Sequence, residues 1–379
     1  MSGRDIPYLI VATDYATTCS GTCPTCVLTA IERKRSYPAT TPEMIISGLE
    51  AAALEYGRVG TLALGIGRAN VLDLPESSID EIGRIVRGAA ACFEYDELVV
   101  EVSTSLVGKI DRQIARAKAI LEAASQWGCD IRFVVVTNTA LHSEKYWRNV
   151  DLFYRAISDL RGGMHSEESG DIIQLALAVD SLPDPGELAE RVAGYRSPVN
   201  LTWAPAFDRG LASPGNLERL EGWIGEWYRI TAGTDFDSSL VNRVRQNLPM
   251  ADVGMPDAVA HAAESSRAIV YVSPDGSWHN GLFTVLAEID PVRFDPGGSA
   301  EDVSGTTPRA LRRFLTNPSC AACEFSNACI ASGSHRIGMI SLRQFPEGTE
   351  ACPSGLRTAF ASASSEQVSR AGRWHHGHS

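Results

Sequence analysis

Cysteine is the residue whose number and spacing in this chain most directly suggest chemistry. Seven of the nine cysteines fall into two groups, one at residues 19–26 and one at residues 320–352, while Cys92 and Cys129 stand alone. Thiolates bind metals and act as nucleophiles, and clustered cysteines in a reducing compartment indicate metal binding or catalysis before disulfides. The two groups are therefore the first candidates for functional sites.

The first group has the spacing C-x3-C-x2-C, formed by Cys19, Cys23 and Cys26. It lies between the first predicted strand and the first predicted helix, and loops in that position carry the active sites of barrel enzymes. Three thiolates can hold three corners of an iron–sulfur cubane, which leaves the fourth iron open to a small molecule. A structural zinc ion would need a fourth ligand, and the first histidine is the distant His142.

Strand-like and helix-like segments alternate along residues 1–210. Strands alternating with helices of this length indicate a parallel sheet built from βα units, and six units are fewer than the eight of a closed barrel. We therefore expect an α/β fold, a partial (β/α)6 TIM-type barrel. The predicted strands are Tyr8–Thr13, Thr61–Leu64, Leu98–Val102, Ile131–Thr137, Ile172–Val179 and Val199–Trp203; the helices follow Thr41-Pro42-Glu43 and cover Ser78–Ala91, Lys109–Gln126, Glu144–Leu160 and Pro185–Tyr195.

The pattern changes after residue 210. Residues 211–267 are expected to be a helical connection, and its helix at Asn216–Ile230 places Trp223 and Trp227 in a core. Residues 268–357 begin with a hairpin signal at Pro274-Asp275-Gly276 and then show little regular pattern around the second cysteine group, as in a domain organised by metal. Residues 358–379 are expected to be a loose tail.

A C-x3-C-x2-C loop after the first strand of such a barrel resembles the radical S-adenosylmethionine (radical SAM) superfamily. The resemblance implies that Cys19, Cys23 and Cys26 hold a [4Fe–4S] cluster whose open iron binds S-adenosylmethionine (SAM). One electron then cleaves SAM to methionine and a 5′-deoxyadenosyl radical, which abstracts hydrogen from a substrate. Thr25 departs from the family, which usually has an aromatic residue there.

The same resemblance suggests residues that contact SAM at the ends of the second, third and fourth strands. Glycines after the second strand allow close backbone approach to a ligand, although an ordinary turn between strand and helix is an equal alternative. Polar residues at strand ends are also common caps. The candidates are Gly65, Gly67, Ser103, Thr104, Thr137 and Asn138.

The second group, Cys320-x2-Cys323-x5-Cys329 followed by Cys352, resembles the SPASM domain of some radical SAM enzymes. That domain normally holds two auxiliary [4Fe–4S] clusters, but Gly333 stands where one further cysteine is expected. The resemblance therefore implies one auxiliary cluster with four thiolate ligands, and a zinc site is the alternative. A cluster with four cysteine ligands has no open iron that could bind substrate. The predicted role of this cluster is therefore to relay electrons.

Three further residues have predicted positions that bear on the reaction. Asp180 follows the fifth strand and is the candidate catalytic residue, able to bind a substrate hydroxyl or amine or to take a proton; the alternative is a turn residue. Cys92 and Cys129 are expected at the end of the barrel away from the site. Because an epimerase often needs a thiol as hydrogen donor, their position makes epimerisation the less favoured reaction.

The amino-acid composition argues against nucleic acid and membranes as partners. The chain has 379 residues, 44 % hydrophobic and 21 % charged residues and a net charge of −12. An acidic chain is a poor partner for nucleic acid or an anionic membrane surface. No apolar run is long enough to span a membrane, and the N-terminus lacks the small-residue cleavage site of a signal peptide. We expect a cytoplasmic protein.

The resemblance implies a radical SAM oxidoreductase or biosynthetic enzyme, for example in natural-product biosynthesis, with two [4Fe–4S] clusters, SAM and a flavodoxin- or ferredoxin-type reductant. Only 18 residues precede Cys19, so we expect no leader-recognition domain and favour a small-molecule substrate. One alternative is a peptide maturase that cross-links or epimerises a ribosomal peptide. The other is a non-enzymatic scaffold with two zinc sites.

Overall fold

The computed structural model describes residues 4–16, 40–67, 70–141, 143–162, 170–203, 214–234, 237–273, 276–280, 315–334 and 351–376. The chain divides into two compact units. Unit 1 comprises Met1–Ala176, Tyr195–Pro198 and Ser266–Leu286. Unit 2 comprises Leu177–Gly194, Val199–Ser265 and Ala287–Ser379. The cysteine group at 320–352 belongs to unit 2 and the candidate SAM residues to unit 1.

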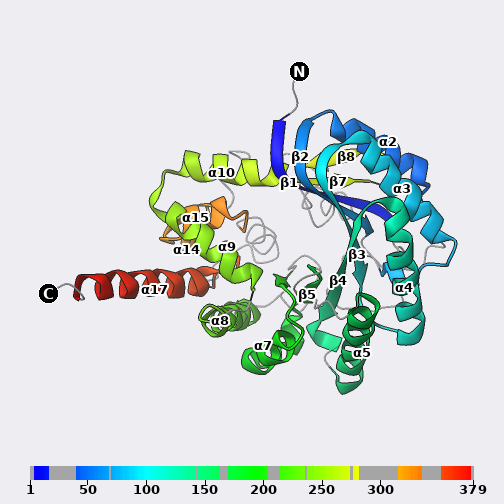
Figure 1. Cartoon of the computed structure of the whole chain (residues 1–379). Helices are drawn as coiled ribbons and strands as arrows, with labels where there is room; N and C mark the ends of the chain where they lie inside the picture. Colours follow the sequence, from blue (N-terminus) through cyan, green and yellow to red (C-terminus); the bar gives the residue numbers. More distant parts are fainter. Residues whose placement is uncertain are drawn as a thin grey trace. The chain divides into compact units, whose positions relative to one another are not determined.

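Unit 1 is a parallel sheet whose strands are followed by helices, as Figure 1 shows. The strand order is β5-β4-β3-β2-β1-β7-β8, and only the β7–β8 pair within it is antiparallel. The elements are β1 (Arg4–Ala16), α2 (Pro42–Ala53), β2 (Tyr56–Gly67), η1 (Val71–Asp73), α3 (Ser78–Cys92), β3 (Glu94–Thr104), α4 (Ile110–Trp127), β4 (Asp130–Asn138), η2 (Thr139–Leu141), α5 (Glu144–Leu160), β5 (Ile172–Ala176), β7 (Ile269–Val272) and β8 (Trp278–Asn280).

The sheet curls into a half-barrel, which confirms the predicted partial barrel. Its curvature is visible in a contact across the concave face: the guanidinium of Arg132 on β4 donates to the Tyr8 hydroxyl on β1 at 2.8 Å, although β3 and β2 lie between these strands. Arg132 also pairs with Glu101 on β3 at 3.2 Å. Burial raises the pKa of Tyr8, and Glu101 adds to the effect, so a polar layer lines this part of the barrel.

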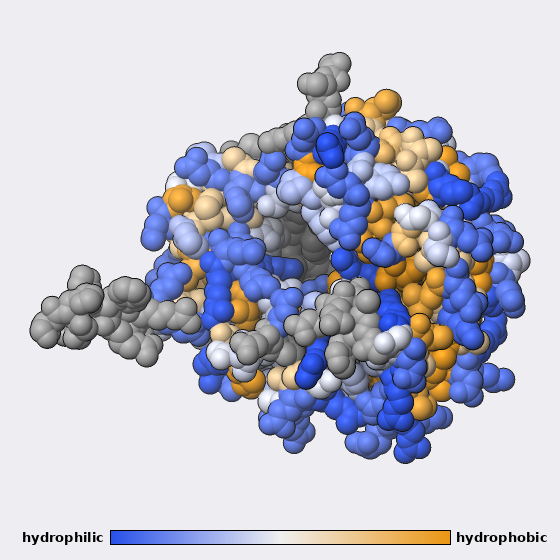
Figure 2. Space-filling view, viewed as in Figure 1, coloured by the Kyte–Doolittle hydropathy of each residue, from blue (hydrophilic) through white to orange (hydrophobic). Residues whose placement is uncertain are grey.

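Side-chain alternation explains why these segments form the wall of a barrel. In β2 the residues Leu62, Leu64 and Ile66 are fully buried, while the residues between them are more exposed or small. In β4 the ring of Phe133 packs edge-on against Phe153 of α5, so this face of the sheet meets the helices. The outer surface over α3–α5 is largely hydrophilic, with hydrophobic residues showing between (Figure 2). This is the pattern expected of amphipathic helices.

Local capping sets the ends of the first helices. The Thr41 hydroxyl accepts from the Met44 amide, and Pro42 begins α2, as the Thr-Pro-Glu signal predicts. Helix α4 ends at Gly128, whose φ of +71° is the left-handed conformation that glycine adopts readily. The fifth strand is shorter than predicted, because the chain leaves β5 at Ala176 and enters the short helix η3 (Val179–Ser181).

The hairpin predicted at residues 274–276 is confirmed, but it lies in unit 1. Strand β7 pairs parallel with β1, from Ile10 to Thr13, and antiparallel with β8. A Cβ on Gly276 would lie 2.9 Å from the Met44 carbonyl oxygen, so the turn packs directly against α2. The barrel sheet thus gains a seventh parallel strand from residues that the sequence had suggested as the start of the C-terminal domain.

Unit 2 contains η3, α7 (Pro185–Ala193), β6 (Val199–Thr202), α8 (Pro214–Thr231), α9 (Ser239–Asn247), η5 (Leu248–Asp252), most of α10 (Met255–Arg267), α14 (Pro318–Ala321), α15 (Ser326–Ala331) and α17 (Arg357–His376). Trp223 and Trp227 of α8 stack with ring centroids 5.4 Å apart and are buried, as predicted. The parallel ladder continues toward β6: the Ile173 amide donates to Pro198 in unit 1, and Leu177 donates to Thr202 in unit 2.

The segment expected as a loose tail begins instead as helix α17. Ala359, Phe360 and Ala363 are buried, and Phe360 stacks on Phe325 with centroids 5.8 Å apart. Helix α17 packs closely on α8 at Gly225, which has no side chain there. A Cβ at Gly225 would lie only 2.4 Å from Thr358. No helix within the described ranges is long and apolar enough to cross a membrane.

Candidate metal and cofactor site

The candidate SAM residues gather at one edge of unit 1, where the parallel strands end. Gly65 pairs with Ala12 of β1 and Glu101 of β3, and Gly67 is the last residue of β2. Thr104 ends β3 and Asn138 ends β4. The carboxyl ends of parallel strands meet at the same edge of a sheet, so the structure brings these residues into one region.

Strand alternation separates the candidates into two faces. Ser103 lies on the same face as Glu101, and Asn138 on the same face as Arg132, which is the face that carries the polar layer. Thr104 and Thr137 lie on the opposite face, where both are buried at about 1 % exposure or less. The alternation favours Ser103 and Asn138 over their neighbours as ligand contacts. All six assignments stay predictions.

Hydrogen bonds fix the backbone at this edge. The Thr13 hydroxyl donates to the Gly65 carbonyl at 2.9 Å, which holds the end of β2 against β1. The Leu106 amide donates to Thr104 at 3.3 Å, and the Ala140 amide donates to the Asn138 side chain at 2.9 Å. Thr104 and Asn138 therefore have local roles that the sequence also allowed.

Two buried polar atoms near this edge lack a hydrogen-bond partner among the described residues. They are the Thr137 hydroxyl oxygen and the side-chain carbonyl oxygen of Asn70, whose amide nitrogen lies 3.4 Å from Ser105. Buried polar groups normally have partners. Thr137 lies on the face opposite the polar layer, so its unpartnered oxygen is not evidence for a ligand bound at that layer.

Several predicted site residues fall outside what is described. Cys19, Cys23 and Cys26 lie between Ala16, the end of β1, and Thr40, where the description resumes. Asp180 belongs to η3 directly after β5, but its side chain is likewise outside the described part. Their proposed roles stay predictions.

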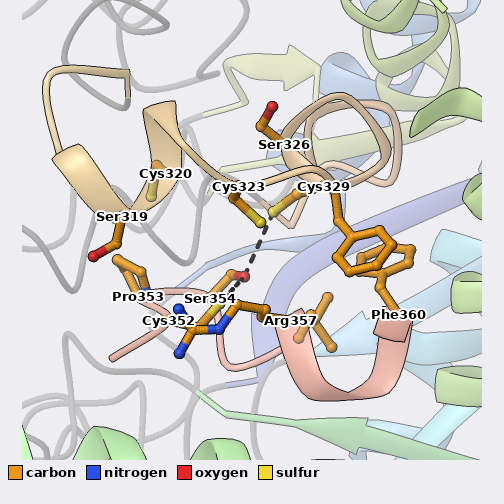
Figure 3. Close-up of a pocket in the computed structure, with 12 residues that line it drawn as sticks. Ser319, Cys320, Cys323, Ser326, Cys329, Cys352, Pro353, Ser354, Arg357 and Phe360 are labelled. Carbon is orange, nitrogen blue, oxygen red and sulfur yellow. Dashed lines mark hydrogen bonds between the residues drawn. The ribbon is translucent and has the colours of Figure 1, made fainter. Parts of the chain in front are cut away.

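The four cysteines of the second group line one pocket in unit 2. Figure 3 shows Cys320 and Cys323 in and beside α14, Cys329 in α15 and Cys352 on the segment before α17. All four are free thiols, although Cys352 is distant from the others in sequence. The other walls come from Phe325, Leu356, Phe360 and Arg357.

Local caps place the thiols that come from the first segment. The Asn317 side chain accepts from the amides of Ser319 and Cys320 and so begins α14. The Asn327 side chain donates to the Val253 carbonyl at 2.8 Å, which fixes α15 against η5. Cys320 and Cys329 are both buried, with 5 % and 7 % of their surface exposed.

A buried carboxylate places the fourth thiol. Glu221 of α8 has an 8 % exposed side chain and accepts from the Cys352 amide at 3.0 Å. The same carboxylate accepts from the Arg357 guanidinium at 3.0 and 3.1 Å and from the Thr358 hydroxyl at 3.0 Å. One side chain therefore anchors both the loop of Cys352 and the start of α17.

Three of the four thiols that line this pocket, those of Cys320, Cys323 and Cys329, have a raised pKa. Burial raises the pKa of Cys320 to about 12, and Cys352 and Cys323 add to the effect. Burial also raises the pKa of Cys323 and raises that of Cys329 well above its usual value, in each case with a contribution from Cys352. Arg357 opposes the effect at Cys320 and Cys323. A pocket that disfavours free thiolates to this extent is suited to a cation that neutralises them.

Cys92 and Cys129 lie at the opposite ends of the strands, as predicted. Cys92 ends α3 just before β3, and Cys129 directly precedes β4. Burial raises the pKa of Cys129 to about 12. Neither thiol is near the carboxyl edge of the sheet.

The fold of this chain is similar to that of radical SAM enzymes. Solved structures of anSMEcpe, a SPASM-domain radical SAM sulfatase maturase, are similar over nearly the whole chain. One, with bound AdoMet, has a TM-score of 0.54 at 10 % identity and covers 96 % of this chain and 98 % of its own. Another, with AdoMet and a Cp18Cys peptide, has a TM-score of 0.54 at 11 % identity, with 97 % and 99 % coverage. No protein-family model and no curated protein sequence matches the chain.

Sequence reasoning missed the residues that surround the second group of thiols. Ser354 lies within hydrogen-bonding distance of two of them, Arg357 lines their pocket, and Glu221 anchors the segment. The sequence could have indicated two of the three. Ser354 and Arg357 follow closely after Cys352 in the run Cys-Pro-Ser-Gly-Leu-Arg, which places them near that thiol. Glu221 is separated by 131 residues from Cys352, and its helix pattern gave no indication of the contact.

Proposed function

We propose that this chain is a radical SAM enzyme that binds a [4Fe–4S] cluster through Cys19, Cys23 and Cys26 and binds SAM at the carboxyl edge of unit 1. When bound, this cluster supplies the electron that cleaves SAM reductively and starts hydrogen abstraction from the substrate. Gly65, Gly67, Ser103 and Asn138 contact SAM, with Thr104 and Thr137 as the further candidates.

The observation that carries the proposal is the conjunction of fold and motif. The chain has the fold of AdoMet-bound anSMEcpe over nearly its full length. It also has a C-x3-C-x2-C sequence directly after β1. At 10–12 % identity the similarity concerns the fold alone. The evidence for cluster binding and SAM cleavage is therefore the cysteine spacing. Asp180, directly after β5, is proposed as the residue that binds substrate or takes its proton.

A second [4Fe–4S] cluster is proposed at Cys320, Cys323, Cys329 and Cys352. The chemistry of the donors fits, because four free thiols share one pocket and Arg357 places a positive charge beside them. With all four ligands from the protein, this group has no open position for substrate and carries electrons to or from the reaction.

The proposed substrate is a biosynthetic small molecule, and a peptide is the second candidate. The observation in favour of the second is that anSMEcpe structures contain bound Cp18Cys and Kp18Cys peptides. Product analysis after incubation with SAM and candidate substrates of both kinds separates them. Coupled 5′-deoxyadenosine formation with a peptide alone would replace the small-molecule proposal.

The proposal as a whole is tested by anaerobic reconstitution. Two cubane clusters predict about eight irons per chain, and replacement of Cys19, Cys23 and Cys26 by Ala predicts about four. The triple variant should form no 5′-deoxyadenosine with dithionite and SAM, while the Cys92→Ala control keeps both iron and cleavage. Stoichiometric zinc without iron under these conditions would overturn the proposal. It would favour the alternative hypothesis of a non-enzymatic scaffold with two zinc sites.

A further inference from the structure

The turn that carries Cys352 places a hydroxyl between two of the pocket's thiols. The Ser354 hydroxyl oxygen lies 3.5 Å from the Cys329 sulfur and 3.3 Å from the Cys352 sulfur. Figure 3 shows these two contacts as dashed lines that meet at Ser354. Within the pocket lining, Ser354 is thus the hydroxyl shared by ligands from two distant segments of the chain.

The direction of these bonds depends on the state of the sulfurs. A free thiol can donate to the Ser354 oxygen, as Cys329 does here. A metal-bound thiolate has no proton, so it can only accept, and the hydroxyl has one hydrogen to donate. On metal binding the hydroxyl therefore becomes the donor to Cys329 or Cys352.

The surroundings hold Ser354 in this position. The Gly355 amide donates to the Cys352 carbonyl at 3.0 Å, which closes a turn with Pro353 at its second position and Gly355 at a φ of +75°. The indole of Trp203 donates to the Ser354 carbonyl at 3.1 Å.

Two neighbours fix the ends of this turn. A Cβ on Gly355 would lie 3.0 Å from Ile224, so the turn packs closely on α8. Glu221 holds the Cys352 amide at 3.0 Å from the same helix. Ser354 itself is buried, with 3 % of its surface exposed. The hydroxyl is therefore preorganised before any metal binds.

From this geometry we infer that Ser354 is a positioning residue that donates its one hydroxyl hydrogen bond to the thiolate of Cys329 or of Cys352 and thereby raises the reduction potential of the auxiliary cluster. The inference rests on the proposed function, because it presupposes a cluster at these thiolates. Reduction adds negative charge to the cluster and its sulfurs, and a hydrogen-bond donor stabilises the more negative state. The donor shifts the one-electron equilibrium toward the reduced form.

The expected shift in reduction potential is the contribution of one hydrogen bond. A net contribution of about 0.5–1.5 kcal/mol corresponds to roughly a three- to tenfold change in the reduction equilibrium. At about 59 mV per tenfold change for one electron, this is a shift of about 30–60 mV. Ser354→Ala should lower the midpoint potential by this amount, and Ser354→Thr, which keeps a hydroxyl, should restore most of it.

The test uses the full chain with Cys19, Cys23 and Cys26 replaced by Ala, so that the auxiliary cluster is observed alone. The protein is reconstituted anaerobically and titrated with dithionite and mediators, and the EPR signal of the reduced cluster is followed. Ser326→Ala is the matched control. Ser326 lines the same pocket, but its hydroxyl bonds to no thiol among the described residues. It should leave the potential unchanged.

Iron content distinguishes failure of the inference from failure of the proposed function. If the parent chain holds no iron at these cysteines, the proposed function fails. If Ser354→Ala holds the same iron as the parent, about four per chain, and its potential equals that of the parent, the inference about Ser354 is wrong while the cluster assignment stands. An equal shift in Ser326→Ala would also overturn it, because the effect would then not depend on the bond to the thiolates.

Discussion

The half-barrel of unit 1 and the thiol pocket of unit 2 are held together by different forces. In unit 1 the strands pair along their length, and apolar side chains such as Val100 and Phe133 fill the space beneath the helices. The pocket depends instead on single side chains that join distant segments, with Glu221 and Trp203 both reaching the turn at Cys352–Gly355. The helices that line it are α14, α15 and the start of α17.

This difference predicts different responses to loss of a ligand. A sheet built on backbone pairing and apolar burial does not need a metal to fold, because its core supplies the driving force. A pocket whose thiols disfavour ionisation gains from bound metal, since the metal neutralises the thiolates and ties their segments together. Variants of the pocket should therefore damage unit 2 locally and spare unit 1.

The largest effect is expected from Cys352→Ala. Iron should fall by about half, from about eight to about four per chain, because the second cluster loses a ligand that comes from a separate segment. SAM cleavage with dithionite should remain within about tenfold of the parent, as the barrel is intact. Product formation should fall much further, since the electron partner of the reaction is lost. Iron, 5′-deoxyadenosine and product are measured on the same preparation.

Two outcomes would break the comparison. Equal losses of product and 5′-deoxyadenosine, with the first cluster still loaded, would show that the auxiliary group has no relay role. Full iron and full activity would show that Cys352 is not a ligand. Cys92→Ala, at the far end of the barrel strands, is the control for the general effect of removing a thiol.

A smaller effect is expected from Glu221→Ala. The change removes the acceptor of the Cys352 amide and the Thr358 hydroxyl, both of which then lack a partner, at a cost of roughly 2–4 kcal/mol. Arg357 adds little because it is 40 % exposed and can be hydrated. The Tm of the metal-free protein should fall by roughly 3–5 °C, and reconstitution of the second cluster should become less complete.

The same helix offers a matched control for this prediction. Glu226 of α8 pairs with Arg229 on the surface, with side chains 37 % and 58 % exposed. Glu226→Gln should change the stability by less than about 0.5 kcal/mol. Glu221→Gln should lie between the two, because the amide keeps an acceptor but loses the charge. If all three variants unfold alike, the buried carboxylate does not anchor the pocket.

The regular part of the molecule could be predicted from sequence because its signals are local. Alternating strand and helix patterns predicted the half-barrel, and Thr41-Pro42-Glu43 marked the start of α2. The Pro274-Asp275-Gly276 turn predicted the β7–β8 hairpin. Local signals do not say which sheet a hairpin joins, and the pairing of β7 with β1 depends on contacts over more than 250 residues of sequence.

The environment of the site could not be predicted in the same way. Cysteine spacing identified the thiols, but the contacts of Ser354, Trp203 and Glu221 depend on tertiary packing. Adjacent residues such as Ser103 and Thr104 looked equivalent until the strand placed them on opposite faces. The helix α17 was mistaken for a tail because its small residues carry a weak pattern, although Phe360 is buried.

The smallest effects on turnover are expected from replacing Cys92 or Cys129. These variants test whether either thiol, at the end of the barrel where the strands begin, takes part in the reaction. Cys92→Ala and Cys129→Ala should leave turnover within a few-fold of the parent, because both lie where the strands begin. If either variant still cleaved SAM but accumulated a substrate radical or an unquenched by-product, that cysteine would be the hydrogen donor. Epimerisation would then replace the proposed reaction.

The reactivity of Cys129 tests separately whether this thiol is buried before β4. Burial, with a further contribution from Asp130, raises its pKa to about 12, so the thiol stays protonated at neutral pH and the thiolate forms only as the pH approaches that value. Against an ordinary thiol of pKa 9, the thiolate population at pH 8 is roughly a thousandfold lower, and the greater basicity of the thiolate recovers about half of this on a logarithmic scale. Alkylation by iodoacetamide, followed by peptide mass spectrometry, should therefore be roughly 30-fold slower than for a free cysteine and should accelerate with rising pH. Rapid labelling at pH 7 would show that Cys129 is an accessible thiolate, and the burial that raises its pKa would then be wrong.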